Sequence, residues 1–218
     1  ALARRLERRL PQTVDIVVVD ERSDHLLQHE LHRVVRKPDF AADILVPLEA
    51  VLDRATVRVA TVEGVDRERR TVHLADGDLD YDVAAVCLGA ETAYHGIPGV
   101  REYGTPLKRV ADARTIRSEF LDVLDCDGRV VVGGAGLSGV QVAGELAALA
   151  AEEDGNAEVL LLERLDAVAP AFPPKFQRAV REELDAAGVT VRTGMRVEEV
   201  TADAVRTPGE RFDYDQLV

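Results

Sequence analysis

The stretch Arg129-Val130-Val131-Val132-Gly133-Gly134-Ala135-Gly136-Leu137-Ser138-Gly139 decides the fold of this 218-residue chain. A short apolar strand runs into glycines spaced G-x-G-x-x-G, and a helix-forming run from Val140 to Glu152 follows. In such a turn the first glycine permits the tight bend, the second lets the backbone approach a pyrophosphate, and the third lets helix and strand pack closely. The start of the helix adds free N–H groups and the positive end of the helix dipole, which favour phosphate.

A second strand, Glu158–Leu162, ends on the acidic residue Glu163. An acid about 20 residues beyond such glycines is placed to accept the ribose hydroxyls of a dinucleotide. The order of strand, glycine turn, helix, strand and acid therefore predicts a dinucleotide site. Ser138 is not a candidate nucleophile, because G-L-S-G lacks the G-x-S-x-G spacing of a nucleophile elbow.

A related unit occurs earlier in the chain, at an offset of 143 residues for the first pair of segments below and of 134 and 133 residues for the other two. The matching segments are Val17–Asp20 with Leu160–Glu163, Thr56–Val65 with Thr190–Val200, and Asp80–Val86 with Asp213–Val218. These offsets between the paired segments are far longer than the roughly 20 to 50 residues of solenoid repeats, so they indicate a duplicated domain. Asp20 is then the counterpart of Glu163.

The repeat also predicts what lies at the two ends. The glycine motif of the first copy would fall before residue 1, and Leu2–Leu10 would be the tail of the helix that follows it. The second copy stops just before the counterpart of Leu88 and Gly89. We therefore expect the chain to be a piece of a longer protein, truncated at matching places.

Composition excludes several classes of protein. The formal net charge is −13 with acids spread along the chain, which argues against nucleic-acid binding because that requires a basic face. Dense surface carboxylates fit a halophilic source, since concentrated salt screens their repulsion. No apolar run reaches the roughly 20 residues of a membrane-spanning helix. Two distant cysteines, Cys87 and Cys126, favour a cytoplasmic location.

The alternation of strands and helices predicts an α/β fold. We expect two tandem Rossmann-like units, each a parallel sheet with helices plus an antiparallel β-meander, with domains over 1–105 and 106–218 and a linker at Gly96–Gly99. The predicted helices are 2–10, a short one within 26–36, 111–124, 137–152 and 174–187. The predicted strands are 14–19, 57–65, 70–75, a buried strand at 83–88, 129–133, 158–162, 189–192 and two or three more before 218, with a hairpin turn at 75–78.

Three stretches resemble the type II NADH dehydrogenases, within the FAD-dependent pyridine nucleotide–disulfide oxidoreductase superfamily. They are Asp20–Glu30, Ile97-Pro98-Gly99 with Leu107-Lys108, and Val132–Gly139 with Ala143-Gly144-Glu145-Leu146. The resemblance implies an FAD-binding domain over 1–105 that lacks its first strand and glycine motif. It implies an NAD(H)-binding domain over 106–218 that is incomplete at its C-terminal end.

The resemblance also implies the activity of a flavoprotein oxidoreductase of electron transport. NADH would pass a hydride to FAD, and the electrons would go on to a quinone. FAD would contact Asp20, Val62, Leu88 and Gly89. NADH would lie on Gly134, Gly136, Leu137, Ser138, Gly139 and Glu163. Glu163 would favour NADH over NADPH, whereas an arginine such as Arg164 can accommodate a 2′-phosphate, so the preference stays open.

One position departs from the pattern of the resembled family. Those enzymes often carry a Glu near the nicotinamide where this chain has Gln141, and an amide cannot accept a proton at neutral pH. A proton-relay role at this position is therefore in doubt. The resemblance further implies peripheral attachment to the inner face of the cell membrane through an absent C-terminal region, and it allows a homodimer.

The same residues bear on several alternative chemistries. Segments 21–49 and 140–158 contain no cysteine, which excludes the disulfide reductases. Cys126 could belong to a sulfide:quinone reductase, but we interpret it as structural, and we interpret Cys87 as part of a buried strand. His25, His29 and His32 would share a face if their segment were a helix, but we expect no metal there. A related flavoprotein with another acceptor, such as a sulfide:quinone or ferredoxin reductase, and a redox-silent NAD-binding protein remain the alternatives.

Overall fold

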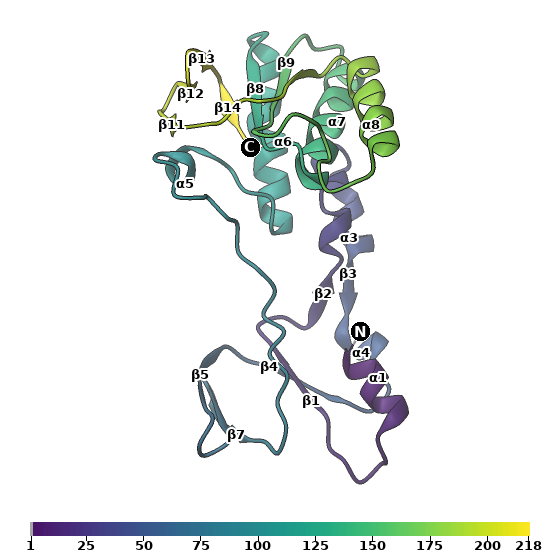
Figure 1. The fold of residues 1–218 in the computed structure, drawn as a ribbon. Coiled ribbons are helices and arrows are strands. Elements are labelled where there is room, and N and C mark those ends of the chain that lie inside the picture. The colour runs from purple at the N-terminus through teal and green to yellow at the C-terminus, as the bar shows by residue number, and fades with distance from the viewer. Residues whose placement is uncertain (1) are drawn as a thin grey trace. The chain divides into compact units, whose positions relative to one another are not determined.

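The computed structural model describes residues 2–218, which form two compact units (Figure 1). Unit 1 consists of the residues up to Leu27 together with Ala42–Ala90. Unit 2 consists of Gln28–Ala41 together with Glu91–Val218. A short segment from the first half of the sequence is therefore built into the second unit.

Unit 2 is organised around a four-stranded parallel sheet in the order β10-β9-β8-β14. Its strands are β8 (Arg129–Gly133), β9 (Glu158–Leu162), β10 (Thr190–Arg192) and β14 (Gln216–Leu217). The side chains of Val130–Val132 and of Val159–Leu162 are at most 3% exposed. Such continuous apolar runs are typical of parallel strands covered on both faces.

Three long helices belong to this sheet: α6 (Val110–Asp125), α7 (Leu137–Glu152) and α8 (Pro174–Ala186). On α6 the buried residues Ala113, Ile116, Phe120 and Val123 recur at helical spacing, so one face of the helix packs inward. α8 has proline at its first position, where the missing N–H costs nothing, and Gly188 follows it with φ +81°.

An antiparallel meander completes unit 2: β11 (Glu199–Val200), β12 (Ala204–Thr207) and β13 (Glu210–Asp213). Val200, Val205 and Phe212 join it to the sheet in one apolar cluster with Val131, Leu160, Leu162 and Leu217. The short α5 (Val100–Tyr103) lies beside β11.

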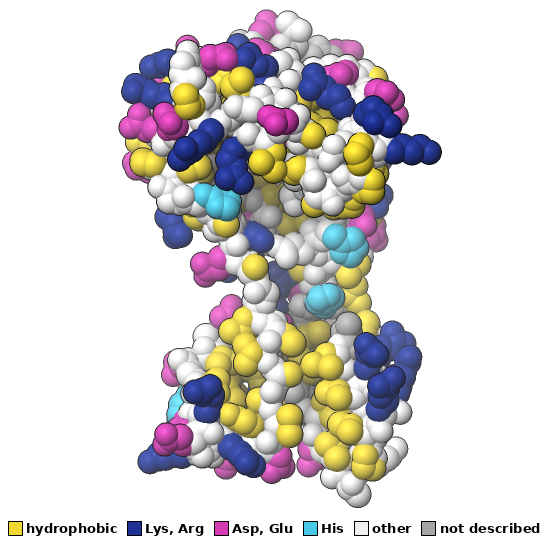
Figure 2. All heavy atoms as spheres, viewed as in Figure 1, with side chains coloured by type: hydrophobic (Ala, Val, Ile, Leu, Met, Phe, Trp, Pro, Cys, Tyr) yellow, Lys and Arg dark blue, Asp and Glu magenta, His cyan; other side chains and the backbone are white. Residues whose placement is uncertain are grey.

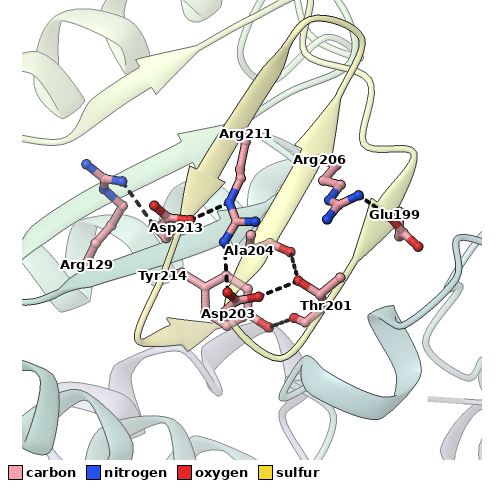
Figure 3. A network of polar contacts seen from close by, with 9 residues as sticks. All are labelled: Arg129, Glu199, Thr201, Asp203, Ala204, Arg206, Arg211, Asp213 and Tyr214. Carbon is pink, nitrogen blue, oxygen red and sulfur yellow. Dashed lines mark hydrogen bonds and ion pairs between the residues drawn. The ribbon is translucent and has the colours of Figure 1, made fainter.

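A polar network holds the strands of this meander together (Figure 3). The Arg211 guanidinium lies 2.8 Å from an Asp203 carboxylate oxygen and 2.7 Å from one of Asp213. The Thr201 hydroxyl donates to Asp203 at 2.7 Å, and the Tyr214 hydroxyl donates to the Thr201 carbonyl at 2.6 Å. The hydroxyl of Thr201 and the charge of Arg211 lower the pKa of Asp203. Tyr214 therefore serves in packing and hydrogen bonding within unit 2.

The 28–41 segment contains η1 (Gln28–Glu30), α2 (Arg33–Arg36) and η2 (Pro38–Phe40), and it runs into α3 (Ala41–Ile44). α2 packs against both α6 and α7. Leu31, Val34 and Val35 are at most 1% exposed, so the segment contributes core residues to unit 2.

Two arginines fasten the 28–41 segment to the helices. The Arg36 Nε lies 2.6 Å from Oε2 of Glu145, and its Nη1 lies 2.8 Å from Oε1 of Glu152. The Arg117 Nη1 donates to the carbonyls of Val35 at 3.2 Å and of Arg36 at 2.8 Å, at the end of α2. These bonds satisfy carbonyl groups that so short a helix leaves unpaired.

Unit 1 contains three small sheets. β1 (Val17–Asp20) pairs in parallel with β4 (Thr56–Val59), β2 (Asp24–Leu26) pairs antiparallel with β3 (Leu45–Pro47), and β5 (Val62–Asp66), β6 (Thr71–Leu74) and β7 (Gly77–Asp80) form a meander. Its helices are α1 (Leu2–Arg9), α4 (Leu48–Val51) and all of α3 except Ala41. The predicted hairpin at 75–78 joins β6 to β7.

The internal repeat is visible in the strand register. Val17 lies opposite Thr56 in unit 1, and Leu160 lies opposite Thr190 in unit 2, which are the same pairs of positions in the two copies. Each unit combines parallel pairing with an antiparallel meander. The predicted α/β class with two tandem Rossmann-like units is confirmed.

The prediction of a buried strand at 83–88 was wrong. Val83, Val86 and Leu88 are 90%, 73% and 83% exposed, and the segment forms no strand. In unit 2 the corresponding β14 is buried because it pairs with β8. Among residues 2–218 no strand of unit 1 takes the place of β8, so the apolar sequence has nothing to pair with. Cys87 is consequently exposed rather than part of a buried strand.

The predicted short helix within 26–36 is present as α2, preceded by the end of β2 and by the 3-10 turn η1. One other local prediction needs correction. Gly96–Gly99 is not a free linker, since the Pro98 carbonyl accepts the Val200 N–H at 2.9 Å. A Cβ at Gly99, where φ is +80°, would lie 1.9 Å from the Val200 carbonyl oxygen.

Candidate dinucleotide site

The glycine turn after β8 has the geometry that its spacing predicts. Gly134 has φ +98°, a conformation that residues with a side chain rarely adopt, and its N–H donates to the Leu162 carbonyl at 2.7 Å. A Cβ on Gly139 would lie 1.8 Å from the Gly134 carbonyl oxygen, so only glycine fits where helix and turn meet. A Cβ on Gly136 would meet no atom within 4 Å. The second glycine therefore faces open space, where a ligand can approach the backbone.

Helix α7 begins immediately after this turn. Its first N–H groups, from Leu137, Ser138 and Gly139, have no partner within the helix, because intrahelical bonds start only one turn later. Leu137 is 43% exposed and Ser138 is exposed. Together with the positive end of the helix dipole, these donors make a site that favours phosphate.

Glu163 connects the glycine turn to the end of β9. It is only 8% exposed; its Oε2 accepts the Ala135 N–H at 2.7 Å and its Oε1 accepts the Leu165 N–H at 2.8 Å. The Ala135 N–H is therefore directed at the carboxylate rather than at the open side of the turn. Each carboxylate oxygen keeps a second lone pair that can accept a ribose hydroxyl. The sequence predicts an acidic residue at this position, but it does not predict the hydrogen bond from the Ala135 N–H that links this residue to the glycine turn.

We expect Glu163→Gln to lower the free energy of unfolding by about 1 to 3 kcal/mol, because an amide offers one acceptor oxygen to two N–H donors. Chemical denaturation would measure the loss. Glu158→Gln, at the start of β9, is the matched control: Glu158 pairs with Arg129 and is 41% exposed, so its loss should cost less than about 1 kcal/mol. Equal losses in the two variants would contradict the role given to Glu163.

A pocket of about 280 Å³ adjoins the start of α7 within unit 2. Three separate stretches of sequence line it, and none of the lining residues is acidic although the chain carries a net charge of −13. They are Gln28, His29, His32, Leu107, Lys108, Ser138 and Gln141. Sequence reasoning placed only Ser138 and Gln141 at a site, because the 28–41 segment reaches the pocket through tertiary packing.

His25, His29 and His32 do not lie on one face of a helix. His25 lies in β2, His29 in η1, and His32 immediately before α2. Burial lowers the pKa of His32, although Glu145 and Glu30 oppose this effect. Within residues 2–218, no group of three or more His, Cys, Asp or Glu residues is arranged to hold a metal ion.

The residues predicted for flavin lie in unit 1. Asp20 ends β1, and its exposed carboxylate accepts the Arg22 N–H at 3.0 Å. Its carbonyl accepts the Ala60 N–H at 2.9 Å, which brings the end of β1 close to Val62 at the start of β5. Leu88 and Gly89 lie on the exposed segment that forms no strand. The roles of Asp20, Val62, Leu88 and Gly89 in flavin binding therefore stay predictions.

The match to known proteins agrees with this geometry. A sequence model of the family described as "Pyridine nucleotide-disulphide oxidoreductase" matches residues 1–218. The chain is 26% identical over 220 residues to the "NADH dehydrogenase-like protein YutJ" of Bacillus subtilis, covering 100% of this chain and 60% of that protein. It is 25% identical over 199 residues to the "Type II NADH:quinone oxidoreductase" of Staphylococcus saprophyticus, covering 83% of this chain and 50% of that protein.

A solved structure, NDH2 from Plasmodium falciparum in complex with NADH, has the same fold. It superposes with a TM-score of 0.85 at 18% identity, over 94% of this chain and 50% of that one. At this identity the likeness shows the fold alone. The chain thus spans half to three fifths of the length of these relatives, at 50% and 60%.

Proposed function

The chain belongs to the pyridine nucleotide-disulphide oxidoreductase family, and we propose that it is part of an FAD-dependent NADH:quinone oxidoreductase of the type II NADH dehydrogenase kind. The observation that carries the proposal is the glycine turn of unit 2, with Gly136 facing open space and Glu163 fixed beside it. The relatives, which include a type II NADH:quinone oxidoreductase, support the same activity.

In this proposal residues 106–218 bind NADH. The N–H groups of Leu137, Ser138 and Gly139 would hold the pyrophosphate, and Gly134 and Gly136 would let it approach the backbone. Glu163 would accept the ribose hydroxyls, and its negative charge disfavours a 2′-phosphate, so NADH is preferred over NADPH. Gln141, which lines the adjoining pocket, would lie near the nicotinamide and orient its amide by hydrogen bonding.

Residues 1–105 would contribute to FAD binding, with Asp20 on the adenosine ribose, Val62 at the adenine, and Leu88 and Gly89 along the ribityl–pyrophosphate. Bound flavin would supply the electron chemistry, taking a hydride from NADH and passing electrons to a quinone. The chain's own residues bind and orient the two cofactors.

The partners follow from the same proposal. A quinone acceptor implies electron transport at the inner face of the cell membrane, with peripheral attachment, and the assembly would be a homodimer. Among the helices of residues 2–218, none combines the length and the apolar character needed to cross a bilayer.

Flavin absorbance tests the proposed activity on the protein that contains this chain. We expect NADH to bleach the yellow flavin and a soluble quinone to restore its colour. Bleaching by sulfide but not by NADH would replace the proposal with a sulfide:quinone reductase. The absence of any bleaching, with NADH binding retained, would favour a redox-silent NAD-binding protein.

We also propose that the protein is halophilic, because its net charge of −13 comes from acids spread along the chain. At about 1 M salt the Debye length falls to about 3 Å, which removes most of the repulsion between surface carboxylates. The midpoint of thermal unfolding should therefore rise between low salt and multimolar salt. An unchanged midpoint would contradict this proposal.

A further inference from the structure

Lys108 is a half-buried cation that no acidic side chain contacts. It lines the pocket beside the start of α7, whereas the other two lysines of the chain, Lys37 and Lys175, are exposed. Among residues 2–218, no carboxylate oxygen lies within 4.0 Å of the Lys108 Nζ. Arginines such as Arg36 and Arg129 contact carboxylates at 2.6 and 2.7 Å. Figure 2 shows acidic and basic side chains close together over much of the visible surface. An ammonium group without such a partner gives the pocket a positive potential.

The acids that flank the pocket residues in the sequence are already paired with arginines. Glu145 lies on α7 one turn beyond the residues that line the pocket, and its Oε2 lies 2.6 Å from Nε of Arg36. Glu30 follows His29, and its Oε2 lies 3.1 Å from Nη1 of Arg33. Neither acid is among the residues that line the pocket. The charge presented by the pocket wall is therefore positive.

One acid does contact Lys108, but only through the backbone. Oδ2 of Asp112 accepts the N–H groups of Lys108 and of Arg109 at 2.8 Å each. These bonds belong to the cap at the start of α6 and fix the backbone just before that helix. The Asp112 carboxylate thus holds Lys108 in place at the pocket wall.

The other polar groups of the wall are uncharged or basic. Gln28, Gln141 and Ser138 offer amide and hydroxyl groups that can hydrogen-bond a carboxamide. His29 and His32 carry no negative charge in either protonation state. Such a wall suits a neutral polar ring and disfavours a cationic one.

The two redox forms of nicotinamide differ by one positive charge. The dihydronicotinamide of NADH is neutral, and loss of a hydride from its C4 to the flavin leaves the cationic pyridinium ring of NAD⁺. We propose that Lys108 makes this part of the site selective for the reduced nucleotide, so that NAD⁺ leaves in exchange for NADH. The inference rests on the proposed function, which puts the nicotinamide near Gln141 in this pocket.

Coulomb's law sets the size of the effect. At an effective dielectric constant of about 20, two like charges about 7 Å apart change an equilibrium by about 5-fold with salt screening and by about 50-fold without it. Thermodynamic linkage requires the same factor to make bound NADH a weaker hydride donor. The charge of Lys108 therefore serves the exchange of product for substrate rather than the hydride transfer itself.

Calorimetric titration with two nucleotides tests the proposal on the protein that contains this chain. NAD⁺ carries the cationic ring, and the redox-inert tetrahydronicotinamide analogue of NADH carries a neutral ring, so both affinities are measured without hydride transfer. We expect the neutral analogue to bind about 5- to 50-fold more tightly than NAD⁺. Lys108→Gln should remove this preference by strengthening the binding of NAD⁺, whereas Lys108→Arg, which keeps the charge, should preserve it.

The matched control is Lys175→Gln, which removes the same charge from an exposed lysine in the first turn of α8. This variant should keep the original ratio of the two affinities. ADP-ribose, which lacks the nicotinamide, should bind equally to all variants and thereby show that each is folded. Failure of the original protein to bind ADP-ribose would contradict the dinucleotide site of the proposed function, and the inference with it.

Three results would overturn the inference while leaving the dinucleotide site intact. The first is equal affinity of the original protein for NAD⁺ and the neutral analogue. The second is an unchanged ratio in Lys108→Gln. The third is an equal fall of the ratio in Lys175→Gln, which would reflect the net charge of the protein rather than the pocket.

Discussion

Gly136→Ala is expected to lower the affinity for NADH by about 10- to 100-fold while leaving the chain folded. The new Cβ would meet no protein atom within 4 Å, and φ of −67° suits alanine, so nothing in the folded chain is strained. The methyl group would instead occupy the open side of the turn, where we propose that the pyrophosphate lies. The poorer helix cap and the stiffer unfolded chain should offset each other to within about 1 kcal/mol.

The measurement is equilibrium binding of NADH by its fluorescence, with thermal unfolding measured in parallel. Gly144→Ala is the matched control, since Gly144 lies in the middle of α7 and its Cβ would also meet nothing within 4 Å. This control should bind NADH normally and gain about 1 kcal/mol of stability from helix propensity. Normal NADH binding by the Gly136 variant would remove the glycine turn from the proposed site.

Gly139→Ala is expected to damage both stability and binding. Its Cβ would lie 1.8 Å from the Gly134 carbonyl oxygen, far inside the contact distance of two non-bonded atoms, and the obstructing atom is backbone. The turn and the start of α7 must therefore move apart. We expect the free energy of unfolding to fall by about 2 to 3 kcal/mol, at the upper end of the range for overpacking.

The measurements are urea denaturation and NADH titration of the two variants, Gly136→Ala and Gly139→Ala. The Gly136 variant should lose NADH affinity but keep its stability, whereas the Gly139 variant should lose both. A Gly139 variant as stable as the original chain would mean that the close approach of helix and turn is not required by the fold.

Local sequence predicted unit 2 more accurately than unit 1. β8, α7 and β9 were predicted with their observed bounds, because each carries its own apolar pattern and the glycine turn marks the junction between them. Segment 83–88 has an equally apolar pattern but forms no strand. A strand needs a partner, and the partner is not a property of the segment itself.

The candidate site shows the same division. Gly134, Gly136 and Gly139 have the conformations that their spacing predicts. The backbone bonds of Glu163 could not be predicted, since they depend on where the turn and the end of β9 meet in space. His29 and Lys108 are far apart in the sequence and line one pocket only through tertiary packing. The pattern of apolar residues along the chain does not predict such a contact.

The placement of the 28–41 segment has a consequence for the chain during its synthesis on the ribosome. Arg36 precedes its partner Glu145 by 109 residues, and the helices that cover Leu31, Val34 and Val35 lie in that same later part of the sequence. At about 5 to 20 residues per second, ribosomes would need about 5 to 20 s to supply them. During that interval these apolar residues have no surface to pack on, so the emerging chain presents a binding site for a chaperone that the finished molecule no longer has.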